Sequence, residues 1–125
     1  MTSRSFNALV LAITVALTPA TAAGQDQRPY DERLLRLTEV LGSIHYLREL
    51  CGANEGQLWR DRMRELLDAD TPSALRRARL TRSFNTGYRN FSRTYTSCTP
   101  TAQTTAAKFL TEAAQIADNL VRTVP

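Results

Sequence analysis

The sequence predicts an all-α fold: a small four-helix antiparallel bundle, crosslinked by one disulfide, after a cleaved signal peptide. Four segments repeat apolar residues at the three-to-four-residue spacing of amphipathic helices, and no segment shows the alternation typical of a strand. The connections between these segments are short, which favours antiparallel neighbours. The chain has two cysteines, and an export signal precedes them.

The export signal lies at the N-terminus. Arg4 supplies a positive charge, and an apolar run of 12 residues begins at Phe6. That run is shorter than the roughly 20 residues that a membrane-spanning helix needs. Small residues before Ala23 form a cleavage site, so the expected mature chain has no transmembrane span; an uncleaved anchor is the alternative. The expected boundaries are residues 1–22 for the signal peptide, cleaved near Ala22/Ala23, residues 23–29 for a flexible lead-in, and residues 30–125 for a single helical domain.

The first two predicted helices lie on either side of Cys51. Asp31 is the predicted N-cap of the first helix. Asn54, with Gln57 three residues later, fits a capping box at the start of the second. The apolar faces comprise Leu34, Leu37, Leu41 and Ile44 in the first helix, and Trp59, Met63, Leu66 and Leu67 in the second.

The third and fourth predicted helices each begin at a Thr-Pro pair. A threonine cap followed by a first-turn proline is a strong start signal, because proline has a helical φ and needs no N–H partner there. Thr71-Pro72 starts the third helix, which we expect to run to Cys98. Thr99-Pro100 starts the fourth, which ends near Arg122. Poor helix formers around Gly87 leave open a kink or break in the third helix.

Cys51 and Cys98 are predicted to form one structural disulfide. An even number of cysteines in an oxidising compartment favours pairing. In an up-down-up-down bundle, the ends of the first and third helices lie at the same pole, which permits the bridge. One histidine and two distant cysteines make a poor zinc site, so no metal and no cofactor is expected.

Charged residues interrupt the apolar faces of the first two predicted helices. Arg48 projects into the apolar stripe of the first helix, and Glu55 and Arg62 fall on the apolar side of the second, beside Trp59. A buried charge is costly unless it is paired. These residues therefore form a buried charge cluster, in which Arg48 pairs with Glu55 at the disulfide pole, or they line a cleft. Alternatively, each residue interacts favourably with the dipole of its own helix, Arg48 at a C-terminus and Glu55 at an N-terminus.

The chain contains no recognisable catalytic motif, so the protein is predicted not to be an enzyme. The alternative is a small hydrolase acting on cell-wall glycan through Glu55, because an apolar neighbour such as Trp59 can raise a carboxyl pKa. Glycan cleavage usually needs a second carboxylate, and Asp61 and Glu65 project away from Glu55. His45, the only histidine, lacks partners for a metal or a nucleophilic triad.

Positive charge is concentrated in the third helical segment. The chain carries a net charge of +4, yet no acidic residue occurs between Asp70 and Glu112. If that helix is continuous, four arginines project within an arc of about 80°, and we call them the arginine ridge. They are Arg79, Arg82, Arg89 and Arg93.

Two classes of partner suit such a ridge. Guanidinium groups pair well with phosphate and carboxylate, so an anionic envelope component or an acidic periplasmic protein is expected, unless the face is simply solvated. Nucleic acid is not an expected partner, because an exported protein is separated from the nucleic acid of the cell. The aromatic residues also face the presumed core rather than alternating with the arginines.

Two stretches of the sequence resemble a known family. Residues 40–63 contain YLRELCGANE, and residues 84–100 read FNTGYRNFSRTYTSCTP. They resemble a family of small secreted alphaproteobacterial proteins with a domain of unknown function. The resemblance implies a location in the Gram-negative envelope and carries no substrate, cofactor or catalytic residue. We therefore expect a periplasmic helical protein that acts as a non-catalytic envelope binding or interaction module through its basic face.

Overall fold

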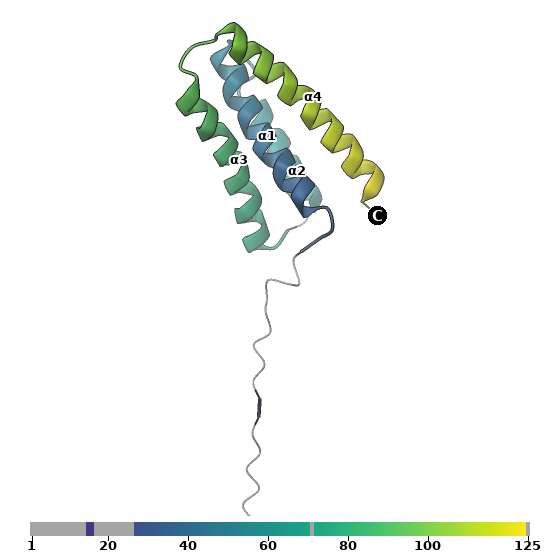
Figure 1. Ribbon diagram of the computed structural model, residues 1–125. Coiled ribbons are helices and arrows are strands. Elements are labelled where there is room, and N and C mark those ends of the chain that lie inside the picture. Colours follow the sequence, from purple (N-terminus) through teal and green to yellow (C-terminus); the bar gives the residue numbers. More distant parts are fainter. Residues whose placement is uncertain (1–14, 17–26, 71, 125) are drawn as a thin grey trace, which may run out of the picture.

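The computed structural model describes residues 15–16, 27–70 and 72–124. These residues form four helices and no strand (Figure 1), which confirms the predicted all-α fold. None of the described helices is both long enough and apolar enough to cross a membrane. Apart from residues 15 and 16, the predicted signal peptide and its cleavage site lie outside the described residues. The helices are α1 (Asp31–Leu50), α2 (Leu58–Asp70), α3 (Ala74–Thr94) and α4 (Pro100–Thr123).

The helix α1 is the centre of the bundle. α3 and α4 pack along two different sides of it, and α2 covers a third (Figure 1). Within the described residues, the backbone of α4 approaches α1 but neither α2 nor α3. The bundle is therefore open between α2 and α4, where an apolar groove of about 320 Å³ lies over α1. Its walls include Leu34, Leu37, Leu66, Leu120 and Val121.

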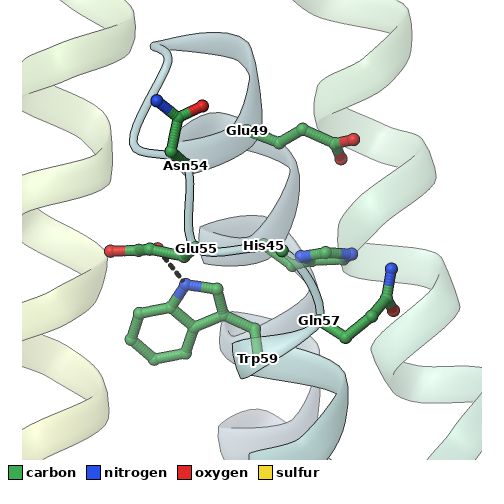
Figure 2. A pocket seen from close by; sticks show the side chains of 7 residues that line it. His45, Glu49, Asn54, Glu55, Gln57 and Trp59 are labelled. Atoms are coloured by element: carbon green, nitrogen blue, oxygen red, sulfur yellow. Dashed lines mark hydrogen bonds between the residues drawn. The ribbon is translucent and has the colours of Figure 1, made fainter.

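The starts of α1 and α2 differ from the prediction. Asp31 is the first residue of α1 rather than its cap, and Tyr30 stands in the cap position without a side-chain cap bond. The predicted capping box of α2 is absent because Asn54 has a φ of 51°, in the left-handed region, and the helix begins only at Leu58. Figure 2 shows Asn54 in the loop that joins α1 to α2.

The starts of α3 and α4 are both capped by a hydroxyl side chain. The start of α4 is confirmed: the Thr99 hydroxyl accepts a hydrogen bond from the Ala102 N–H, and Pro100 is the first helical residue. In α3 the cap is Ser73, whose side chain accepts a hydrogen bond from the Arg76 N–H. Thr71, the predicted cap, lies outside the described residues. α3 ends at Thr94, four residues before the predicted end, because the chain becomes extended at the next residue.

α3 continues through Gly87, without the break that the poor helix formers left open. Gly87 lies instead where α3 crosses α1. A Cβ atom on Gly87 would lie 1.9 Å from the carbonyl oxygen of Glu39, and one on Gly42 would lie 1.9 Å from that of Phe84. The two glycines therefore allow the backbones of α1 and α3 to touch.

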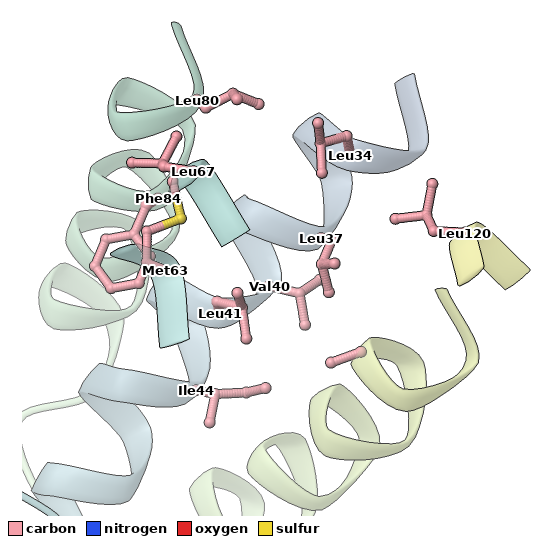
Figure 3. Packing of buried hydrophobic residues seen from close by; sticks show 11 residues of the cluster. Leu34, Leu37, Val40, Leu41, Ile44, Met63, Leu67, Leu80, Phe84 and Leu120 are labelled. Carbon is pink, nitrogen blue, oxygen red and sulfur yellow. The ribbon is translucent and has the colours of Figure 1, made fainter. Parts of the chain in front are cut away.

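The hydrophobic core surrounds α1, which is buried around most of its circumference. Such a helix carries apolar side chains on several faces, as expected for the central element of a bundle. Figure 3 shows side chains of all four helices meeting at this core. The most deeply buried members include Leu34, Leu37, Val40, Leu41, Ile44, Met63, Leu67, Leu80 and Phe84.

The predicted disulfide between Cys51 and Cys98 is confirmed. The two Cα atoms lie 4.9 Å apart, and no cysteine is free. Cys51 is the C-cap residue of α1, and Cys98 lies in the connection between α3 and α4. The bridge therefore ties the end of α1 to the start of α4 at one pole of the bundle.

Candidate functional site

The structure brings Arg48, Glu55 and Trp59 together at the disulfide pole. The Nε of Arg48 donates to both carboxylate oxygens of Glu55, at 3.0 and 3.2 Å, and its Nη2 also donates to Oε1. The indole Nε1 of Trp59 donates to Oε2 of Glu55 at 2.6 Å (Figure 2). Glu55 lies in the loop before α2 rather than on the apolar face of that helix. Its carboxylate links the loop to the last turn of α1.

These hydrogen bonds decide the charge state of Glu55. Donation from Arg48 lowers the pKa of the Glu55 carboxyl, burial opposes this shift, and donation from Trp59 adds to it. Glu55 is therefore ionised at neutral pH. A general acid for glycan cleavage needs a raised pKa, so the geometry suits a structural ion pair better than a proton donor.

Arg62, the fourth residue of the predicted cluster, lies outside it. Its side chain is 58% exposed and pairs with Glu65 at 2.9 Å on the outer face of α2. The core side of α2 is formed by Met63 and Leu67 instead. The prediction for Arg62 is wrong because its side chain points away from the face of α2 that is buried.

A polar pocket of about 240 Å³ lies beside the ion pair. It contains a second carboxylate, from Glu49, that sequence reasoning missed. His45 and Glu49 are four residues apart on α1 and therefore share a face, which is the one sequence signal that could have indicated it. We call this cavity the His45 pocket. It is lined by His45, Glu49, Asn54, Glu55, Gly56, Gln57 and Trp59.

His45 is the most deeply buried polar side chain of this pocket, at 4% exposed. Its ring centroid lies 6.1 Å from that of Phe84 and 5.5 Å from that of Tyr88. Burial lowers the pKa of His45, and the positive charge of Arg60 lowers it further, so the ring is neutral at pH 7. The described residues contain no group of three His, Cys, Asp or Glu side chains that could hold a metal ion.

The arginine ridge lies on the exposed face of α3. Arg79, Arg82, Arg89 and Arg93 are all exposed, and within the described part of the chain none of their guanidinium groups has a hydrogen-bond, ion-pair or ring partner. Every other described arginine has such a partner. The arginines without a partner are therefore gathered on one face of one helix.

Arg76 forms a buried ion network that sequence reasoning also missed. It is 3% exposed, and it contacts Asp31 through Nη1 and Asp70 through Nε, each at 2.6 Å. Arg28 pairs with Asp70 at 2.7 Å, and the hydroxyl of Tyr30 donates to the same carboxylate. Burial opposes the charge of Arg76, but its hydrogen bonds to the two aspartates outweigh this effect and raise its pKa. The network joins α1, α2 and α3 at the pole opposite the disulfide.

Comparison with known proteins gives one match. A family model described as a protein of unknown function (DUF2385) matches residues 29–123, a range that includes all four helices and both cysteines. No curated protein and no solved structure matches the chain. The match therefore gives no ligand, and function has to be argued from the surfaces described above.

Proposed function

The chain belongs to the DUF2385 family of unknown function, and we propose that it is a non-catalytic module of the periplasmic envelope that binds an anionic partner through the arginine ridge. The observation that carries the proposal is the charge arrangement on α3. Arg79, Arg82, Arg89 and Arg93 share one exposed face and have no acidic partner in the described structure. Elsewhere, exposed arginines such as Arg64 and Arg122 pair with a carboxylate of their own helix.

The geometry of the ridge suits an extended anionic partner. Arg93 lies fourteen positions after Arg79, a distance of about 21 Å along the helix axis. Like charges three or four residues apart repel each other, so an anion bound along this face relieves the repulsion. A shallow hollow beside Arg82 and Arg89 is lined by short side chains such as Ala78, which leave room for a phosphate or carboxylate group.

Two further features support a periplasmic location. The Cys51–Cys98 bridge requires an oxidising compartment, and the periplasm is one. The apolar run that follows Arg4 has the length of a signal peptide rather than of a membrane span. In that compartment, anionic lipid headgroups, acidic polymers and acidic proteins all offer the chemistry that guanidinium groups recognise.

The first prediction concerns the ridge. Replacing all four ridge arginines with glutamine is expected to weaken binding to envelope extracts at least about tenfold at low salt. The binding of the wild-type protein should also fall as ionic strength rises, because salt screens exposed charges. Co-sedimentation of the protein with envelope extracts measures both effects. The protein is taken from the periplasmic fraction of cells that express the full chain, so its absence from that fraction contradicts export.

The matched control removes the same net charge elsewhere. Its glutamine substitutions are at Arg33, Arg62, Arg64 and Arg122, which lie outside α3. Binding that is unchanged in the ridge variant, or that falls equally in both variants, would contradict a specific role for the ridge.

A glycan hydrolase that uses Glu55 is the second candidate, and one observation favours it. Glu49 and Glu55 line the same pocket, so a second carboxylate is present beside the one that the hydrolase hypothesis invokes. The lowered pKa of Glu55 opposes this role, because it leaves no proton to donate at neutral pH.

The second prediction separates the two candidates through Glu55→Gln. We expect this variant to lose about 1 kcal/mol of unfolding free energy at pH 7, because Arg48 is partly exposed and solvent screens the pair. Since the pKa of Glu55 is depressed, the wild-type advantage is present above the ordinary carboxyl pKa. It disappears as the pH falls through the depressed value. Urea unfolding at several pH values measures this difference.

Turnover of peptidoglycan fragments is measured on the same samples. Hydrolysis by the wild-type protein that Glu55→Gln abolishes, without loss of stability, would establish the hydrolase and refute the non-catalytic proposal. Glu65→Gln, which removes an exposed carboxylate of α2, is the matched control.

A further inference from the structure

We propose that the His45 pocket binds one neutral sugar ring, through the imidazole of His45 and the side chains of Glu49 and Gln57. This site is separate from the arginine ridge, which is formed by the outer face of α3. The proposal rests on three observations: a buried imidazole that has no hydrogen-bond partner among the described residues, a balanced set of donors and acceptors, and the size of the cavity.

The first observation is the state of His45. Within the described residues neither ring nitrogen has a hydrogen-bond partner, and neither is sealed from solvent, although the residue is only 4% exposed. Its nitrogens therefore reach solvent through the pocket that the residue lines. Both nitrogens are therefore open to a ligand, and a ligand hydroxyl that hydrogen-bonds to one of them would displace the water that solvates it.

The second observation is the chemistry of the walls. Figure 2 shows the imidazole of His45 between the carboxylate of Glu49 and the amide of Gln57, with the carboxylate of Glu55 turned to the opposite side. A carboxylate accepts hydrogen bonds, an amide both donates and accepts, and a neutral imidazole does one at each nitrogen. Hydroxyl groups also both donate and accept, so a polyhydroxylated ligand matches this set.

The charges around the pocket favour a neutral ligand. The carboxylate of Glu49 opposes an anion. One arginine at the margin opposes a cation, because the guanidinium of Arg60 lies over the rings of Phe84 and Tyr88. Arg48 and Glu55 neutralise each other. The hydroxyl of Tyr88, on α3, donates a hydrogen bond to the carboxylate of Glu49 at 3.5 Å.

The third observation is size. The cavity of about 240 Å³ is below the range of pockets that hold drug-sized ligands, about 300–1,000 Å³, so it suits a single small ring. The indole of Trp59 supplies a second aromatic ring beside that of His45, and its N–H already donates to Glu55. The expected dissociation constant of so small a ligand is on the order of millimolar.

Nuclear magnetic resonance on the oxidised, isotope-labelled protein tests the proposal. The probes are glucose, galactose, mannose and N-acetylglucosamine, with methylammonium and acetate as charged probes. We expect at least one sugar to shift the His45 ring signals and the backbone amides of residues 54–57. The variants Gln57→Ala and Glu49→Gln, both at exposed side chains, should bind that sugar at least about fivefold more weakly. His45→Phe should abolish the binding.

Matched controls make the test decisive. Gln115→Ala, on the exposed face of α4, should bind the sugar as the wild-type protein does, and so should the ridge variant. The proposal is overturned if no sugar shifts these signals, if only the charged probes do, or if the Gln57 and Glu49 variants bind as the wild type does. If the protein binds no sugar, the proposal that the arginine ridge binds an anionic partner is unaffected, because a separate binding experiment tests it. If His45→Phe does not fold, the two variants at exposed positions decide the outcome.

Discussion

We expect Gly87→Ala to lower the free energy of unfolding by about 3 kcal/mol, measured by urea denaturation of the oxidised protein. The new Cβ atom would lie 1.9 Å from the Glu39 carbonyl oxygen, and backbone atoms cannot move aside as a flexible side chain can. α1 and α3 must separate instead, which loosens the most extensive helix contact of the bundle. Alanine is intrinsically the better helix former by about 1 kcal/mol, so propensity alone predicts the opposite sign.

Two other glycines provide controls for this result. Gly42→Ala meets the Phe84 carbonyl oxygen at the same distance and should cost a similar amount. Because one separation of the helices relieves both clashes, the double variant should lose less than the sum of the two. Gly52 has a φ of +73° with open space around it, so Gly52→Ala should lose only about 1–2 kcal/mol. A Gly87→Ala protein as stable as the wild type would refute the close contact.

Arg76→Met is expected to cost about 3–5 kcal/mol, because it leaves two aspartates without their central partner. Asp70 is only 6% exposed and Asp31 only 18%, so neither charge can easily regain its hydration. Methionine fills much of the volume of the arginine side chain, which limits the contribution of a new cavity. Chemical denaturation at pH 7 measures the loss.

A second set of variants separates the loss of the ion network from the loss of packing. Asp70 still pairs with Arg28 in Arg76→Met, so adding Asp31→Asn removes the carboxylate that has lost its cationic partner and should recover part of the stability. Arg77→Met, beside it on the exposed face and paired with Asp68 at 3.4 Å, should change stability by less than about 0.5 kcal/mol. Equal losses for Arg76→Met and Arg77→Met would contradict a buried network.

The four helices could be predicted because the signals for a helix are local in the sequence. The disulfide could be predicted because an export signal places two cysteines in an oxidising compartment. Apolar spacing defines a helix wherever it occurs, and Thr99-Pro100 marks a start by its own chemistry. Helix ends were less well predicted. Asn54 has the side chain of a cap, but its left-handed backbone places it in a turn, three residues before the position where a cap would lie.

The remaining errors concern contacts between helices, which no local pattern encodes. Gly87 has the same propensity whether it breaks a helix or lies against a neighbouring backbone, and only the position of α1 decides between them. Arg76 resembles its exposed neighbours in sequence, yet Asp31, one of its two partners, is 45 residues away. Glu49 was overlooked for the same reason, because the pocket that it shares with Glu55 exists only when the loop folds back on α1.

The position of α4 makes stability uneven across the bundle. Its backbone contacts one helix rather than two, and the disulfide anchors the chain next to its first turn. Local opening events start where few buried contacts must break, and within α4 that place is the C-terminal half, away from the disulfide. Such a motion exposes Leu34 and Leu37 on the floor of the groove while the glycine contact between α1 and α3 stays intact. α4 is therefore tethered by the disulfide beside its first turn, and along the rest of its length α1 is the one helix that its backbone approaches among the described residues.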